Sequence, residues 1–150
     1  MLVWRLSVKQ YRKFDGAGAR AVGGRWNSPG IAVVYTSASV SLATLEFLAH
    51  LSQSRSVRDL VLTSAELRKN IRIERIDASD LPARWREFPS PPYLQKIGDE
   101  WIIKRVSAVL AVPSAVIPQE DNYLLNPAHP DFKRIRVNQP IPFSLDPRLT

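Results

Sequence analysis

The chain has 150 residues, no cysteine and a formal net charge of +7. This length favours one domain around a single core, and the lack of cysteine excludes thiolate catalysis, disulfide bonds and cysteine-based zinc sites. The N-terminus lacks the features of a signal peptide and no apolar stretch is long enough to span a bilayer, so the sequence predicts a soluble cytoplasmic protein without a membrane partner.

The first elements are a strand, an irregular connection and a hairpin. Leu2 to Leu6 is predicted to be a strand, and Val8 to Val22 a basic, glycine-containing connection that could fold over a cleft. Asn27 to Gly30 signals a turn, because proline fixes φ and glycine tolerates positive φ. We therefore expect Arg25 to end one strand and Ile31 to Tyr35 to form the next. Arg25 and Tyr35 would then face each other across a hairpin.

A helix is predicted to follow Tyr35. The candidate N-caps are Ser37, Ser39 and Ser41, and the apolar residues at helical spacing are Leu42, Leu45, Leu48 and Ala49. Glu46 lies four residues after Leu42 and so points along this apolar face. A carboxylate that faces a protein interior is costly unless it is paired, so Glu46 needs a cationic or polar partner. Arg25 and Tyr35 are the nearest candidates in the sequence.

The remaining elements mix strands and helices irregularly. The predicted strands are Asp59 to Thr63, Ile71 to Ile76, Val106 to Val112, Arg134 to Val137 and Ile141 to Leu145. The predicted loops are Leu81 to Pro92 and Gln119 to Asp131, and a second helix is predicted from Tyr93 to Lys104. Gly98 weakens that helix by about 1 kcal/mol relative to alanine. Without regular strand-helix-strand alternation, the sequence predicts one α+β domain over residues 1–150 with largely antiparallel sheets.

Several short motifs follow one another at characteristic spacing. They are Trp4-Arg5-Leu6, Gly24-Arg25-Trp26-Asn27, Val34-Tyr35-Thr36-Ser37, Leu45-Glu46, Gly98-Asp99-Glu100-Trp101, Val112-Pro113-Ser114-Ala115 and the segment Asn122 to Pro130. In this order the motifs resemble the RES domain, the toxin component of Xre-RES type II toxin-antitoxin systems, over nearly the whole chain. The resemblance implies an ADP-ribosyltransferase-like fold and functional residues at Arg25, Tyr35, Glu46 and Ser114.

The same resemblance implies substrate and partners. NAD would be a substrate rather than a permanently bound cofactor, and an Xre-type antitoxin would neutralise the protein. Contact with DNA would be made only through the antitoxin, and a homodimer could form within the complex. No G-x-G-x-x-G turn follows a predicted strand, so a Rossmann mode of NAD binding is not expected.

Residue chemistry suggests how these side chains would act on NAD. Cleaving the bond between nicotinamide and ribose develops a cationic ribosyl group, which an anionic Glu46 would stabilise as a catalytic residue. Arg25 would serve both catalysis and binding, because its planar fork suits phosphate or ribose oxygens. Tyr35 would stack on the nicotinamide ring. Ser114 would hydrogen-bond the ribose or carboxamide, although a serine beside proline could also be an ordinary turn residue.

Several alternatives stay open from the sequence. The acceptor of the ribosyl group could be water, phosphate or a protein side chain, the last giving a mono-ADP-ribosyltransferase. His50 lies four residues after Glu46 and could form an acid-base pair with it, as in a basic RNA-cleaving or RNA-binding module. A helix-terminal role for His50 is the commoner one. With His129 as the second histidine and no ligand cluster nearby, no metal site is predicted.

Overall fold

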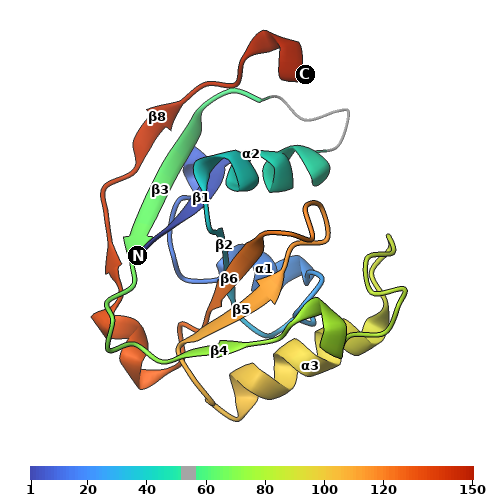
Figure 1. Ribbon diagram of the computed structural model, residues 1–150. Helices are drawn as coiled ribbons and strands as arrows, with labels where there is room; N and C mark the ends of the chain where they lie inside the picture. Colours follow the sequence, from blue (N-terminus) through green and yellow to red (C-terminus); the bar gives the residue numbers. More distant parts are fainter. Residues whose placement is uncertain (52–56) are drawn as a thin grey trace.

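The computed structural model describes residues 1–51 and 57–150 (Figure 1). Its strands are β1 (Leu2–Val8), β2 (Val34–Ser37), β3 (Leu60–Glu66), β4 (Ile73–Arg75), β5 (Val109–Pro113), β6 (Asp121–Leu125), β7 (Arg136–Val137) and β8 (Ile141–Phe143). Its α-helices are α1 (Ala17–Val22), α2 (Val40–Ala49) and α3 (Pro92–Ile103). Its short 3-10 helices are η1 (Lys9–Tyr11), η2 (Ala78–Asp80), η3 (Pro130–Arg134) and η4 (Pro147–Leu149).

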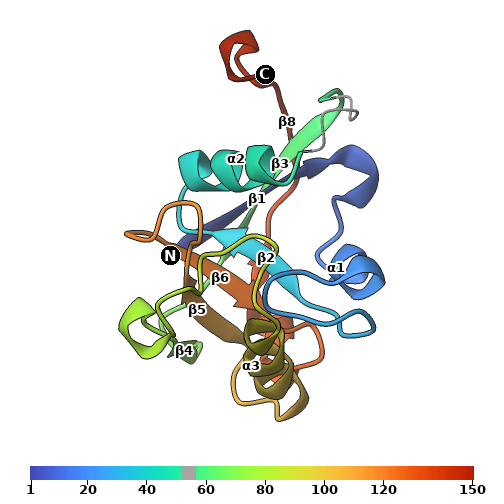
Figure 2. The same cartoon turned by 90° about the vertical axis from the view of Figure 1, so that its right-hand side faces the viewer.

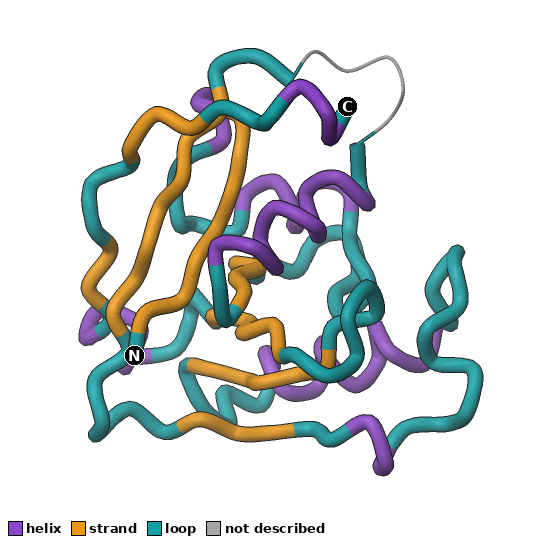
Figure 3. Tube along the Cα trace, turned by 45° about the horizontal axis from the view of Figure 1, so that its top comes forward, coloured by secondary structure: helices purple, strands orange, loops and turns teal. Residues whose placement is uncertain are grey.

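The strands form one curled sheet in the order β4-β5-β6-β2-β1-β3-β7, with β8 paired to β3. All described pairings are antiparallel except that of β4 with β5. Because the sheet curls, β1 and β3 run at a steep angle to β4 and β5 (Figures 1 and 3). The predicted α+β architecture with largely antiparallel strands is confirmed.

Strand β5 is buried on both faces, which explains its uninterrupted apolar sequence. Val109 and Ala111 belong to the core cluster on one face of the sheet. Leu110 and Val112 alternate with them and join the cluster on the other face. This buried strand, paired with β4 and β6, ends at Pro113 and so positions the residue that follows it.

Two helices cover separate parts of one side of the sheet. Phe47 of α2 packs over β1 and β3, against Leu6 and Leu62. Leu94 and Trp101 of α3 belong to the core cluster that includes β5 and β6. Strands β2 and β6 therefore lie between the two helices (Figures 1 and 2). Within the described part of the chain, no helix has the length and hydrophobicity needed to cross a bilayer.

The predicted hairpin at Arg25 is wrong. Residues 24–27 form a tight turn closed by a bridge between Gly24 and Asn27, and β2 begins only at Val34. The cause is the buried Asn27 side chain, whose Nδ2 donates to the carbonyls of Ala19 and Ile31, at 2.9 Å each. These bonds fold the chain back on itself locally. Arg25 therefore does not stand on a strand that pairs with the strand of Tyr35.

Two further segments differ from the sequence prediction. The connection Val8 to Val22 contains η1 and α1 rather than irregular backbone alone. The predicted loop Gln119 to Asp131 contains β6, a central strand that pairs with both β2 and β5. Polar residues at both ends of this short apolar core conceal it in the sequence. The other elements lie close to their predicted positions.

The apolar face of α2 is also shifted from the prediction. Leu42 and Ala43 are buried, whereas Leu45 is 39% exposed and Ala49 is exposed. Helix α2 packs against β1 and β2, with Leu42 and Ala43 buried and Phe47 against the cluster that contains Leu6 and Leu62. Glu46 is consequently half-buried at the edge of this contact rather than in its centre.

Candidate active site

Helix α2 sets the position of Glu46. Of the three candidate caps, Ser39 begins the helix, since its side chain accepts a hydrogen bond from the Leu42 N–H at 3.0 Å. Burial of Leu42 and Ala43 then fixes the rotation of the helix about its axis. This rotation turns Glu46 towards the ends of β5 and β6, where its carboxylate meets two side-chain donors.

Both donors bind the same carboxylate oxygen. Ser114 Oγ donates to Glu46 Oε1 at 2.7 Å, and Asn122 Nδ2 donates to it at 2.6 Å. Distances this short are typical of charge-assisted hydrogen bonds to an ionised carboxylate. Glu46 Oε2 has no hydrogen-bond partner among the described residues. The carboxylate is thus oriented through one oxygen, and the other is available.

The two donors are themselves locked in orientation. Ser114 is fully buried, and its hydroxyl oxygen accepts from the N–H groups of Val116 and Ile117 at 3.1 and 3.0 Å. Its single proton is therefore directed to Glu46. Ser37 Oγ donates to Asn122 Oδ1 at 2.7 Å, which turns the Asn122 amide nitrogen towards Glu46. Among the described residues, the network holds the carboxylate without a direct ion pair.

Arg25 extends from the 24–27 turn to a neighbouring loop. Its Nη1 donates to the carbonyls of Trp85 and Glu87 at 2.8 and 3.2 Å. Burial lowers the pKa of Arg25, and the negative field of Glu46 opposes this shift. An arginine nevertheless stays charged at neutral pH. Arg25 is thus a tethered cation within electrostatic range of the candidate carboxylate, although the described part of the chain contains no salt bridge between them.

Tyr35 supports the turn that carries Arg25. Its hydroxyl accepts from the Trp26 N–H at 3.0 Å and donates to Asn27 Oδ1 at 2.6 Å. Burial is the main reason that the pKa of Tyr35 is raised above its ordinary value, so the hydroxyl stays protonated. The structure therefore gives the phenol group a positioning role in addition to any stacking by its ring.

Helix α3 also binds the 24–27 turn. Gln95 Nε2 donates to the carbonyls of Gly24 and Asn27 at 3.0 Å each. Asp99 accepts from the N–H and the hydroxyl of Ser28 at 2.9 and 2.6 Å. Gly98 lies against the Trp26 backbone, where an added Cβ would come within 1.7 Å of the carbonyl oxygen. Glycine at position 98 lets α3 approach the Arg25 turn closely, and Asp99 binds the residue that follows the turn.

The structure brings Glu46 and Ser114 together but assigns Glu46 different partners from those expected. Asn122 and Ser114, rather than Arg25 and Tyr35, bind its carboxylate. The alternative Glu46 and His50 acid-base pair is absent from the described contacts, because His50 Nδ1 lies 2.7 Å from the Glu46 backbone carbonyl. His50 instead is the exposed C-cap of α2.

Sequence reasoning missed Asn122 and Ser37 as members of the site. Asn122 stands in a segment that was predicted to be a loop, so its neighbours across β2 and β5 could not be inferred. Its place in the register opposite Ser37 follows only from the pairing of β2 with β6. The asparagine within the motif Asn122-Tyr123 was the one available signal.

Comparison with solved structures supports the architecture. The fold is similar to a chain in the crystal structure of the M. tuberculosis MbcT-MbcA toxin-antitoxin complex, with a TM-score of 0.77. The match covers 95% of this chain and 84% of that chain at 16% sequence identity. At this identity the likeness concerns the fold.

Sequence relatives match over nearly their full length. A protein of Yersinia enterocolitica called "Toxin Res" is 38% identical over 99% of both chains. A protein of Sphingobium called "Prs ADP-ribosylating toxin" is 36% identical, over 97% of this chain and 94% of its own. The family model for the RES domain matches residues 2–146. The chain therefore belongs to the RES domain family.

Proposed function

We propose that the chain is the toxin of a toxin-antitoxin pair and that it cleaves the bond between nicotinamide and ribose in NAD. The observation that carries this proposal is the orientation of the Glu46 carboxylate. Ser114 and Asn122 fix one oxygen, and the other has no protein partner among the described residues. The toxin role is supported by the relatives named "Toxin Res".

The free oxygen of Glu46 suits the charge that develops during this reaction. As the bond breaks, its electron pair passes to the positively charged ring nitrogen, and nicotinamide leaves as a neutral molecule. The ribosyl carbon becomes cationic, and a preorganised carboxylate oxygen beside it lowers the barrier. An oxygen of the acceptor then bonds to that carbon and loses its proton to solvent. Glu46 acts through its negative charge and does not donate a proton in this step.

Arg25 is suited to bind oxygen atoms of the substrate, whereas Glu46 would face the cationic ribosyl carbon. Nη1 is occupied by two loop carbonyls, while Nε and Nη2 have no partner among the described residues. These remaining N–H groups can donate to ribose or phosphate oxygens of the substrate. Arg25 would thereby hold the sugar against Glu46. Because the same guanidinium binds two carbonyls of the 85–87 loop, the position of Arg25 depends on the conformation of that loop.

Transfer of ADP-ribose to a protein is the second candidate function. The relative named "Prs ADP-ribosylating toxin" favours it, since that name describes such a transfer by a protein 36% identical to this one. Both candidates share the first chemical step at Glu46 and differ only in the acceptor.

One product analysis separates these outcomes. Purified protein is incubated with NAD in buffer with phosphate, in buffer without phosphate and with added bacterial protein extract, and the products are examined by mass spectrometry. Free ADP-ribose identifies water as the acceptor, phosphorylated ADP-ribose identifies phosphate, and a modified protein identifies transfer. NAD that stays intact in all three mixtures would contradict the proposed function.

The proposal also includes the partners. We expect an Xre-type antitoxin to neutralise the protein in the cytoplasm and to make any contact with DNA. NAD is treated as a consumed substrate, so no permanently bound cofactor is expected. A homodimer within the toxin-antitoxin complex is a further expectation, which the mass of the purified complex would test.

A further inference from the structure

The loop that precedes α3 is held in place by contacts of its own. The Trp85 side chain is buried in the core cluster that also contains Trp26 of the 24–27 turn. The Trp85 N–H donates to the Pro82 carbonyl at 3.1 Å, and the Glu87 N–H donates to the Arg84 carbonyl at 3.2 Å. The side chains of Arg84 and Glu87 form an ion pair within the loop. A loop anchored in this way can hold an exposed side chain at a defined place.

Arg86 extends from this loop to the turn that follows β5. Its Nε donates to the Ala115 carbonyl oxygen at 3.0 Å. That carbonyl belongs to the same planar peptide group as the Val116 N–H, which donates to Ser114 Oγ at 3.1 Å. Arg86 therefore binds one side of the peptide group whose other side orients the Ser114 hydroxyl.

These contacts form a chain of hydrogen bonds that ends at the candidate carboxylate. The guanidinium of Arg86 donates to the peptide carbonyl, the peptide N–H donates to Ser114 Oγ, and Ser114 donates to Glu46 Oε1 at 2.7 Å. Each donor in the chain points towards Glu46. A cation that polarises a peptide carbonyl makes the N–H of the same group a stronger donor, and linked hydrogen bonds strengthen one another.

We propose that Arg86 is a positioning residue for Glu46 and that it acts through the peptide group between Ala115 and Val116 and through Ser114. The proposal rests on the function proposed above and deepens it, because it adds a residue that orients the carboxylate without touching the substrate.

The backbone of the same loop holds the other charged residue of the site. The carbonyls of Trp85 and Glu87, on either side of Arg86, accept hydrogen bonds from Arg25. The loop thus contacts the cation of the site through its backbone and the orientation of the anion through the Arg86 side chain.

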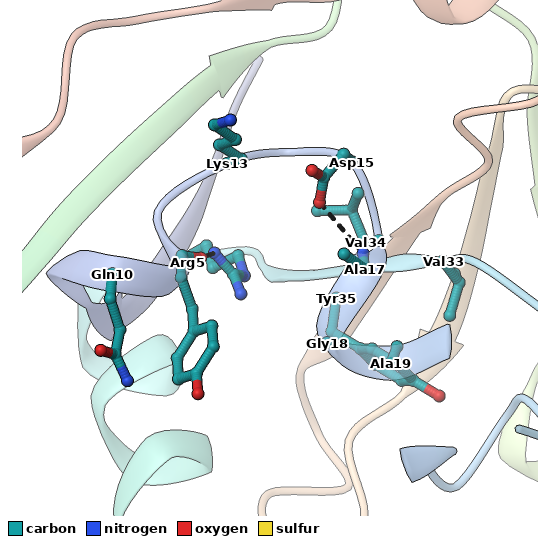
Figure 4. A pocket seen from close by; sticks show the side chains of 12 residues that line it. Arg5, Gln10, Lys13, Asp15, Ala17, Gly18, Ala19, Val33, Val34 and Tyr35 are labelled. Carbon is teal, nitrogen blue, oxygen red and sulfur yellow. Dashed lines mark hydrogen bonds between the residues drawn. The ribbon is translucent and has the colours of Figure 1, made fainter. Parts of the chain in front are cut away.

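The hollow beside Tyr35 is a separate feature. Its lining comes from Arg5 of β1 and from residues in the segments 10–19 and 33–35 (Figure 4). Arg86 and Ala115 are not among the lining residues. A substitution at Arg86 therefore leaves the walls of this hollow unchanged, and its effect can be assigned to the Ser114 turn.

Two substitutions separate the hydrogen bond of Arg86 from its charge. Glutamine carries a donor nitrogen at the same number of bonds from Cα as arginine Nε, so Arg86→Gln keeps the bond to Ala115 and loses the charge. Arg86→Met keeps an unbranched stem and loses both. The kcat for NAD cleavage should fall about tenfold in Arg86→Met and about threefold in Arg86→Gln. KM should stay within about twofold of the wild-type value, because Arg86 contacts no substrate atom.

A Ser114→Ala background distinguishes positioning from direct contact. Without the serine hydroxyl the chain of bonds is broken, so Arg86→Met should lower kcat no further. If Arg86 instead bound the substrate directly or merely stabilised the loop, the substitution would lower the rate by the same factor in both backgrounds. That result, or a rise in KM in place of the fall in kcat, would overturn the proposal.

Arg72→Met is the matched control. Arg72 is an exposed arginine whose Nη2 donates to Glu74 Oε2 at 2.9 Å, in the connection between β3 and β4. Its kcat and KM should equal those of the wild type.

NMR spectroscopy tests the chain of bonds without any turnover of NAD. The resonances compared are the amide proton of Val116 and the side-chain carboxyl carbon of Glu46. Arg86→Met should shift both, whereas Arg72→Met should shift neither. Unshifted resonances in a folded Arg86→Met protein would overturn the proposal. Shifted resonances in a protein that leaves NAD intact would refute the proposed reaction while the role of Arg86 in orienting Glu46 stands.

Discussion

Asn122 turns a half-buried carboxylate into an oriented one. It shares Glu46 Oε1 with Ser114 and is itself held by Ser37. Asn122→Ala should leave the glutamate charged but free to rotate, and misplacement of a reacting group on this scale lowers turnover about 10-fold to 100-fold. The loss should appear in kcat rather than in KM for NAD, since the substitution removes no proposed substrate contact.

Asn138→Ala provides the comparison for this variant. It deletes another side-chain amide, whose Nδ2 donates to Ser64 Oγ at 2.9 Å away from the Glu46 network. Its kcat should equal that of the wild type. A wild-type kcat in a folded Asn122→Ala protein would show that Ser114 alone suffices to orient Glu46.

Arg25 combines an anchored and an available part in one side chain. Lysine at this position could donate to the carbonyls of Trp85 and Glu87 or reach the substrate, but it lacks the planar fork that does both. Arg25→Lys should therefore raise KM for NAD about tenfold, the loss expected for a hydrogen bond to a charged group. Steady-state kinetics on the folded variant measure this, and an unchanged KM would remove Arg25 from the binding site.

Helix α3 lies against the Arg25 turn at Gly98. Gly98→Ala would place a Cβ 1.7 Å from the Trp26 carbonyl oxygen, which the helix can relieve only by moving away. Such overpacking costs about 3 kcal/mol. We expect a clearly lower midpoint of thermal unfolding together with reduced activity, because the Gln95 and Asp99 contacts to the turn would lengthen.

Gly18→Ala is the paired control for Gly98→Ala. Gly18 lies in α1, and its added Cβ would meet no atom within 4 Å. Alanine in a helix is favoured over glycine by about 1 kcal/mol, so this variant should be as stable as the wild type or slightly more stable. Equal unfolding midpoints for the two alanine variants would show that α3 adapts to the added methyl group.

At the level of elements, hydrophobic periodicity and helix-cap residues predict the helices and strands that depend on residues close together in the sequence. The helix after Ser39, the helix containing Gly98 and the apolar strand before Ser114 follow from residue spacing, and their positions in the structure agree closely. The turn at Arg25 did not follow, because buried side-chain hydrogen bonds of Asn27 replace strand pairing there. Strand β6 also escaped prediction, since its identity depends on neighbours distant in the sequence.

The candidate site shows the same division between local and long-range information. Glu46 could be singled out because a carboxylate near an apolar helix face needs a partner. Its actual partners could not be named, since Ser114 and Asn122 lie 68 and 76 residues away in the sequence. The family resemblance supplied Ser114, and only the sheet order supplies Asn122 and Ser37.

At the scale of the whole molecule, the net charge of +7 concerns recognition more than folding. Arg25 places part of that charge within electrostatic range of Glu46, at the proposed substrate site. A neutralising partner that presents an acidic or polar segment here would gain association rate through electrostatic steering.

Because the chain is proposed to be a toxin, cells that produce this protein alone should stop growing. Co-expression of the neighbouring gene should restore their growth. Normal growth with accumulated folded protein and no partner would contradict the toxin assignment.

The central claim is that Glu46 provides the charge that drives NAD cleavage, and Glu46→Gln tests it most directly. Glutamine keeps the shape and an oxygen that can accept from Ser114 and Asn122, but it removes the negative charge. Loss of one electrostatic stabiliser typically lowers the rate about 100-fold to 1,000-fold. NAD consumption and thermal unfolding should be measured on the same purified preparation. We predict nearly unchanged unfolding with most turnover lost, and a stable variant that consumes NAD at the wild-type rate would contradict the account.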